Sequence, residues 1–231
     1  MPYAHVEAST PVSIVLAALM LKLGGYGIIR FMLPIFSNDL HMYFRPLALF
    51  ISSLGVIYGA LCALRQIDLK RQIAFSSISH MSFASFGIFT FTEVGIKGAI
   101  YLMLSHGLTS TALFYLVGVL SDRYHTRSIM AFGGLFGVMP LFSFFMILAS
   151  LANIGFPGTS GFLPELLVLT AIISSVPGIL LPALFGMLLT TAGTLLALMR
   201  MLFGHVKIYY VSSTITDINR IEFFVLSILS A

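Results

Sequence analysis

Four ionisable residues stand inside long apolar stretches of this sequence, and together they could move protons: Lys22, His80, His106 and Glu165. A charged lysine at the centre of a bilayer costs roughly 3 kcal/mol unless it faces a wet or paired interior. Histidine titrates near neutral pH, so an imidazole can accept a proton and pass it on. No spacing places several good metal ligands on one face, so these four residues predict a proton relay better than a metal site.

The surroundings of the four residues fit this chemistry, but each also has a structural interpretation. His80 lies among the serines of residues 76–82, and His106 lies in a second polar island at 104–111. Hydroxyl groups can hold water across an apolar layer, yet serine also serves as small, hydrogen-bonding glue between membrane helices. Lys22 could likewise serve only the specificity of packing in a helix bundle. Both interpretations stay open at this point.

Glu165 follows a break in the longest apolar stretch. Residues 153–161 contain one proline, Pro157, and three glycines, a composition that favours a discontinuous helix. Broken membrane helices near the bilayer midplane are where transporters bind ions, and a helix N-terminus favours a carboxylate. The alternative is that Glu165 is only a helix N-cap at a re-entrant turn.

The elements that must position these residues are membrane helices. The chain has 231 residues, of which only 9% are charged and 58% are hydrophobic, and its mean hydropathy is +1.04. Soluble proteins carry about 25% charged residues, so the sequence predicts an integral membrane protein. The net charge of +4 comes from cations scattered singly between apolar runs, which excludes a nucleic-acid-binding class. One cysteine, Cys62, excludes a disulfide framework, a cysteine-based zinc site and an iron–sulfur cluster held by this chain alone.

Continuous apolar stretches of about 20 residues predict an all-α, polytopic transmembrane helix bundle in one transmembrane domain, 1–231. The stretch Phe132–Ile172 is expected to cross the membrane once, as a discontinuous helix, and Ile221–Ala231 is too short to cross. About six spans and the start of a seventh are therefore predicted. The five uninterrupted spans are Pro11–Leu33, Pro46–Leu64, Ile73–Phe91, Gly98–Leu120 and Leu180–Phe203.

With this topology the cations divide unequally between the two sides of the membrane. Arg30, Arg45 and Lys97 fall on one side, and Lys22 lies within the membrane. By the positive-inside rule, the richer side is cytoplasmic or faces the mitochondrial matrix. That side holds Arg65, Lys70, Arg71, Arg123, Arg127, Arg200, Lys207 and Arg220.

Several motifs, in order along the chain, resemble the subunit 4 family of mitochondrial NADH:ubiquinone oxidoreductase, respiratory complex I, whose members are antiporter-like. They extend from Met1 to about Phe203, and multi-subunit cation/proton antiporters share the lysine and Pro-Gly features more loosely. The motifs are Met1-Pro2-Tyr3-Ala4-His5-Val6-Glu7-Ala8, Leu21-Lys22-Leu23-Gly24-Gly25-Tyr26-Gly27, Gln66-Ile67-Asp68-Leu69-Lys70, Ser76-Ser77-Ile78-Ser79-His80-Met81 and Ser105-His106-Gly107-Leu108-Thr109-Ser110.

The resemblance implies a fold of fourteen helices with two inverted five-helix repeats and a central hydrophilic axis. Residues 46–203 resemble the second repeat, and the first half of the family fold is absent from this sequence. Lys22 matches the family's central proton-storing lysine, His80 and His106 match its connecting histidines, and Glu165 matches its terminal acid.

The implied function is proton translocation coupled to quinone reduction elsewhere, as part of a proton-translocating NADH:ubiquinone reductase in the mitochondrial inner membrane. A bacterial plasma membrane is the alternative location. The resemblance implies no cofactor on this chain, with FMN, iron–sulfur clusters and ubiquinone on other subunits. The implied partners are the lipid bilayer and other membrane-arm subunits of complex I, with no nucleic acid.

The sequence departs from the family pattern in three places. Pro11 is shifted relative to the usual proline, Pro164 replaces a small residue before the acid, and the family's input glutamate and lysine are missing. Either this is a partial sequence or another polypeptide supplies the front half. We expect a separate hydrophobic chain to dock on Pro11–Leu33, with Gly24, Gly25 and Gly27 allowing close approach.

Two other functions remain open from the sequence. A sodium/proton antiporter subunit would use the same ionisable residues but would be driven by an ion gradient. A purely structural membrane-arm scaffold would use the polar residues only to fix helix packing.

Overall fold

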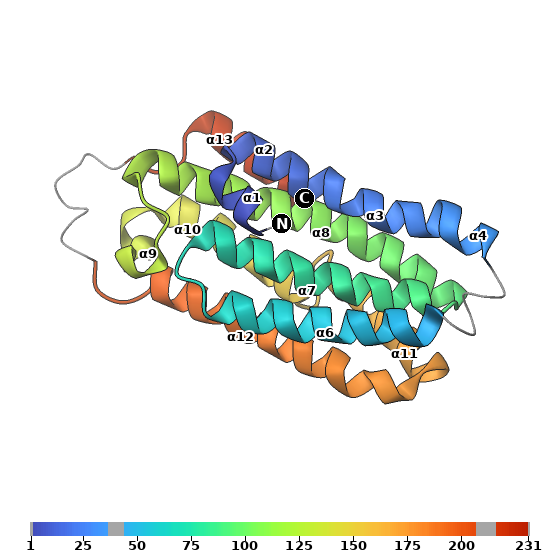
Figure 1. Cartoon of the computed structure of the whole chain (residues 1–231). Coiled ribbons are helices and arrows are strands. Elements are labelled where there is room, and N and C mark those ends of the chain that lie inside the picture. The colour runs from blue at the N-terminus through green and yellow to red at the C-terminus, as the bar shows by residue number, and fades with distance from the viewer. Residues whose placement is uncertain (1, 37–43, 207–215, 231) are drawn as a thin grey trace.

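The computed structural model describes residues 2–36, 44–206 and 216–230. Within these residues the chain is a bundle of helices that lie roughly along one axis, without strands (Figure 1). The first helical run, Thr10–Ile35, consists of α2 (Thr10–Val15), α3 (Leu21–Gly27) and α4 (Leu33–Ile35), joined by two π-helical turns. The other elements used below are α1 (Pro2–Glu7), α6 (Arg45–Leu64), α7 (Leu69–Phe89), α8 (Glu93–Tyr124), α9 (Leu135–Val138), α10 (Pro140–Ile154), α11 (Phe162–Ser175), α12 (Leu180–Leu202) and α13 (Arg220–Ser230).

Four of the five predicted uninterrupted spans are confirmed. Four helical runs among the described residues are long and apolar enough to cross a bilayer: Thr10–Ile35, Arg45–Leu64, Glu93–Tyr124 and Pro177–Leu202. The 21-residue helix α7 covers the predicted span at Ile73 and packs between α6 and α8, although its serines and its polar first turn make it less apolar.

The long stretch after α8 forms two short helices, α10 and α11, of 15 and 14 residues, which lie one after the other along the bundle (Figure 1). A single crossing by the two together stays a prediction. The chain enters α10 beside the end of α12, where the Gly134 amide donates to the Phe203 carbonyl. It leaves α11 directly at the start of α12. The single 23-residue helix α12 thus spans the same distance as α10 and α11 together.

Two helices at the centre of the bundle hold most of the buried polar groups. Helices α7 and α8 are buried along much of their length and contact nearly every other long helix. Small residues allow this closeness: a β-carbon built on Gly59 of α6 would lie 2.9 Å from the Ser79 amide nitrogen of α7. The helix run Thr10–Ile35 lies at the edge, against α8, and most of its surface is exposed.

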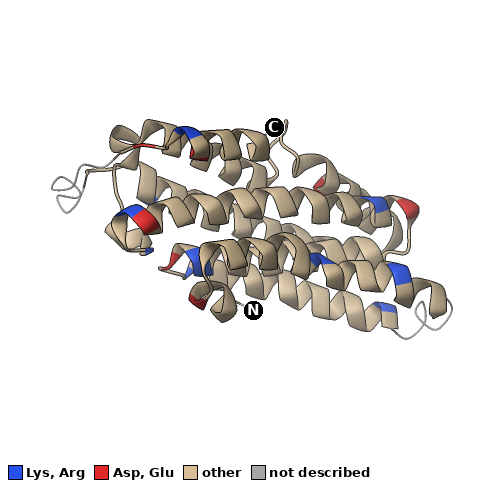
Figure 2. Ribbon diagram, turned by 90° about the horizontal axis from the view of Figure 1, so that it is seen from above, with Lys and Arg blue, Asp and Glu red and all other residues tan. Residues whose placement is uncertain are grey.

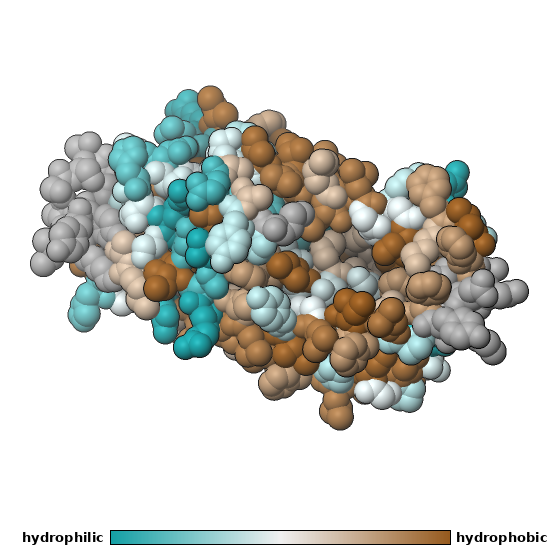
Figure 3. All heavy atoms as spheres, viewed as in Figure 1, coloured by the Kyte–Doolittle hydropathy of each residue, from teal (hydrophilic) through white to brown (hydrophobic). Residues whose placement is uncertain are grey.

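Most charged residues lie toward the two ends of the bundle, as Figure 2 shows. The end where α6 finishes and α7 begins carries seven of the eight cations predicted for the richer side, and Lys207 lies outside the described residues. Arg30, Arg45 and Lys97 lie toward the opposite end, which confirms the division of cations between the two ends. Figure 3 shows hydrophilic side chains over the cation-rich end and a largely hydrophobic face beyond it. Helix α13 has 11 residues, too few to cross a bilayer.

Candidate functional site

Lys22 reaches from the edge helix toward the centre of the bundle. Its Nζ lies 3.0 Å from His106 Nδ1 on α8 and also donates to the Ala17 carbonyl in the preceding π-helical turn, Leu16–Met20. Single π-helical turns inside longer helices occur frequently at functional sites. Gly107 lies beside the Lys22 side chain, because a β-carbon built there would be in ordinary van der Waals contact with Lys22 Cε, at 3.8 Å.

Lys22 is half-buried in this chain, because the run Thr10–Ile35 has neighbours on one side only. One prediction about this helix needs correction. Gly25 packs inside the chain, because a β-carbon on it would meet Met103 of α8. Gly25 is therefore not free for a separate polypeptide, whereas Gly24 and Gly27 have nothing within 4 Å of the β-carbon position.

The two predicted histidines meet between α7 and α8. The ring centroids of His80 and His106 are 5.4 Å apart, and both side chains are buried. An ammonium group only donates hydrogen bonds, so His106 Nδ1 accepts from a charged Lys22, which places the proton of the neutral ring on Nε2. The Nε2 atoms of both rings are buried without a partner among the described residues. Each ring therefore retains one nitrogen through which a proton can pass.

Glu165, on α11, is the fourth of the predicted residues and lies beside His80. Its Oε1 lies 3.7 Å from His80 Nδ1, and it is the only acidic residue buried among those the structure describes. The N-cap of α11 is Gly161, so the alternative that Glu165 is a helix N-cap is wrong. The carboxylate lies against Gly155 in the break, where a β-carbon would stand 2.9 Å from Glu165 Cδ. The break thus makes space for the acid beside the histidines.

All four predicted residues therefore come together, although they belong to four different helices. The contacts run from Lys22 through His106 and His80 to Glu165. Neighbouring groups in this series lie close enough to exchange a proton directly or through one water molecule. No group of three His, Cys, Asp or Glu residues within the described ranges converges as metal ligands would.

Sequence reasoning missed a buried histidine near the cation-rich end. His5 of α1 is 1% exposed, and its ring stacks on Phe114 at a centroid distance of 5.2 Å. Its carbonyl accepts a hydrogen bond from the Ser13 hydroxyl, 2.9 Å away. Burial lowers the pKa of His5 below its ordinary value, and the nearby charge of Lys70 acts in the same direction. The motif His5-Val6-Glu7 drew attention to this histidine in the sequence, but it does not predict that His5 is buried.

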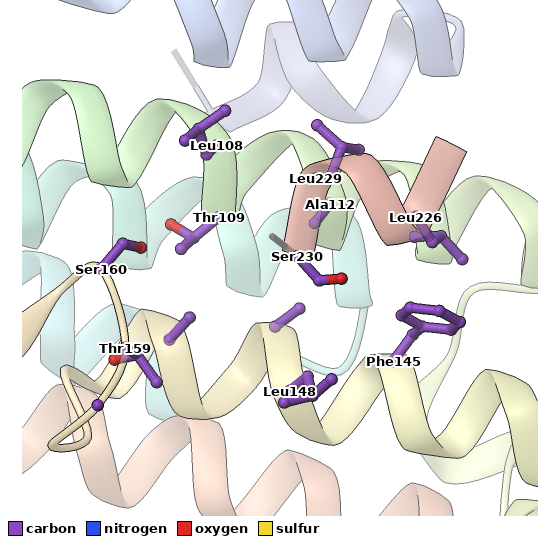
Figure 4. Close-up of a pocket in the computed structure, with 13 residues that line it drawn as sticks. Leu108, Thr109, Ala112, Phe145, Leu148, Thr159, Ser160, Leu226, Leu229 and Ser230 are labelled. Carbon is purple, nitrogen blue, oxygen red and sulfur yellow. The ribbon is translucent and has the colours of Figure 1, made fainter. Parts of the chain in front are cut away.

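A cavity of about 230 Å³ lies beside the helix break, between α8, α10 and α13. Figure 4 shows that Thr109 of α8 and Thr159 and Ser160 of the break line it together with apolar residues such as Phe145 and Leu148. Thr109 donates to the His106 carbonyl. None of the four ionisable residues lines this cavity, so it is separate from the contacts described above.

The fold and the site define a multi-pass membrane protein with a buried series of ionisable side chains around a broken helix. The sequence pattern of the NADH:quinone oxidoreductase/Mrp antiporter transmembrane family matches residues 1–190. The chain belongs to this family.

Individual relatives show the same relationship. The NADH-ubiquinone oxidoreductase chain 4 of Chondrus crispus is 47% identical over 226 residues, which are 98% of this chain and 46% of that protein. The chain spans about half the length of the curated relatives it matches.

Solved structures show the same fold. A chain of respiratory complex I from Thermus thermophilus with bound NADH superposes with a TM-score of 0.90 at 28% identity, covering 99% of this chain and 48% of that chain. A chain of the Mrp complex from a Dietzia species has a TM-score of 0.84 at 23% identity, covering 89% and 38% respectively, and is similar in fold alone.

Proposed function

We propose that this chain is the C-terminal half of a proton-translocating, antiporter-like membrane subunit of an NADH:ubiquinone oxidoreductase in the mitochondrial inner membrane. The observation that carries the proposal is the unbroken series of contacts from Lys22 Nζ, 3.0 Å from His106 Nδ1, to Glu165 Oε1, 3.7 Å from His80 Nδ1. A packing role alone does not require a cation, two imidazoles and a carboxylate in sequence across four helices.

In the proposed mechanism Lys22 stores a proton and the histidines conduct it. Lys22 gives its proton to His106, the proton passes to His80, and Glu165 receives it beside the helix break. A neutral Lys22 is then ready to be loaded again. The energy comes from quinone reduction on other subunits, where FMN, iron–sulfur clusters and ubiquinone would be held. Residues 46–203 would form the second of the family's inverted repeats.

The partners in this proposal are other membrane-arm subunits and a hydrophobic segment that carries the family's input glutamate and lysine. The exposed face of the run Thr10–Ile35 supports such a segment, because only 11% of its most apolar 18-residue stretch is buried within this chain. Gly24 and Gly27 are open there, so another helix could approach closely. A divided subunit, with this segment on a separate polypeptide, stays a prediction that the mass of each chain in the native complex would test.

The test uses the native complex, purified in mild detergent and reconstituted in proteoliposomes. We expect NADH oxidation by a ubiquinone analogue to acidify one side of the membrane, with or without sodium. The second candidate is a sodium/proton antiporter subunit, because the family to which the chain belongs also takes its name from the Mrp antiporters. Sodium-dependent proton movement that needs neither NADH nor quinone would select that candidate and contradict the proposal. A scaffold would be selected if substitution of His106 impaired assembly but left proton movement per electron unchanged.

A further inference from the structure

A second, smaller cavity lies between α7, α8, α10 and α12. Its volume is about 30 Å³. One water molecule needs roughly 10–15 Å³ of such space and two to four polar partners. The polar side chains that line the cavity come from three helices and are Gln72, Ser76, Ser150, Asn153 and Thr194. The cavity is therefore large enough to hold water, and these polar side chains interrupt a mostly apolar lining.

Asn153 supplies an independent reason to place water there. Its side chain is 5% exposed, and its Nδ2 is buried without a hydrogen-bond partner among the described residues. A buried donor left unsatisfied costs about 1–3 kcal/mol, which a water molecule in the adjoining cavity would remove. The amide of Gln72, in contrast, already donates to the Gly193 carbonyl at 2.9 Å.

The position of the cavity connects it to the ionisable series. Gln72, Ser76 and His80 follow one another at intervals of four residues on α7, so they share one face of that helix. Gln72 stands in the first turn of α7, at the cation-rich end of the bundle. On α10, Asn153 stands two residues before Gly155, against which the Glu165 carboxylate lies. The cavity thus lies between the cation-rich end and the His80–Glu165 pair.

We propose that this cavity is a water-binding site, held by Asn153, through which protons pass between the cation-rich surface and the His80–Glu165 pair. The proposal rests on the proposed function and adds a route that does not pass through Lys22. Asn153 is a positioning residue: it holds the water and does not itself gain or lose a proton. The water accepts one proton from one neighbour and gives one proton to the next, so it is unchanged after each transfer.

The test compares four variants in the intact complex. Asn153→Leu and Ser150→Val remove polar groups and fill the cavity, Asn153→Ser keeps a group that can bind water, and Ser143→Ala is the control. Ser143 is also buried on α10, but its hydroxyl donates to the Met139 carbonyl and does not line the cavity. The readouts are ordered water in the cavity by high-resolution cryo-electron microscopy and protons moved per NADH oxidised.

We expect ordered water in the wild-type cavity and in Asn153→Ser, and none in Asn153→Leu or Ser150→Val. Protons moved per NADH should fall in the two apolar variants, by up to the loss seen in Lys22→Met, and stay at the wild-type level in Ser143→Ala and near it in Asn153→Ser. Wild-type ratios in both apolar variants, or a wild-type cavity without ordered water, would overturn the proposal. If Asn153→Leu does not assemble, Ser150→Val decides. A Lys22→Met complex that pumps normally would instead count against the proposed function.

Discussion

Replacing Gly155 with alanine tests whether the Glu165 carboxylate must lie where the structure places it. Gly155 has a φ of 75°, and a β-carbon on it would stand 2.9 Å from Glu165 Cδ and 3.3 Å from Oε1. A non-glycine residue in this left-handed region costs roughly 1–2 kcal/mol. The carboxylate is the free end of a flexible side chain, so it would rotate away from His80, from which it now lies 3.7 Å. The proton would lose its acceptor beside the histidine.

Gly158 provides a matched control in the same break. Its φ is 95°, so alanine is strained there as well, but nothing lies within 4 Å of the β-carbon position. Both alanine variants should therefore inactivate at a lower temperature than the wild type. Only Gly155→Ala should lower the number of protons moved per NADH, to the level of a Glu165→Gln complex. Equal pumping by Gly155→Ala and Gly158→Ala would refute the placement of Glu165 in the relay.

Two further predictions concern the edge of the bundle. The double variant Gly24→Leu/Gly27→Leu should weaken association with the hydrophobic segment expected on the run Thr10–Ile35, measured by subunit retention in mild detergent. The control Gly137→Leu, also at an open glycine, should not, and equal retention in both would contradict the docking face. For His5, burial lowers the pKa in the folded chain, so the unfolded chain binds more protons as the pH falls below about 6.5. The free energy of unfolding should therefore decrease as the pH is lowered through this range, and His5→Phe should make this decrease smaller. An unchanged slope in His5→Phe would show that His5 does not titrate on unfolding.

The sequence was sufficient to predict the helices and the four central residues, for a physical reason. A charge or an imidazole inside an apolar span is expensive, so Lys22, His80, His106 and Glu165 are conspicuous without any structure. Which atoms meet could not be predicted, because these contacts join helices far apart in the chain. The pairing of Lys22 with a histidine depends on how α3 packs on α8.

Other features depend on packing that leaves no simple trace in the sequence. Gly25 looked as available as Gly24, yet only Gly25 turns toward Met103. Asn153 was seen only as part of the break, because nothing in the sequence indicates that its amide lacks a partner beside the polar face of α7.

The most direct test of the account is the number of protons moved per NADH oxidised by a reconstituted Lys22→Met complex. Arg30→Met is the matched control, because Arg30 is a cation on the same helical run but is exposed and lies outside the series. We predict that Lys22→Met assembles and loses the share of pumping that this subunit contributes, while Arg30→Met pumps as the wild type does. A Lys22→Met complex with the wild-type ratio of protons to NADH would contradict the central role of Lys22.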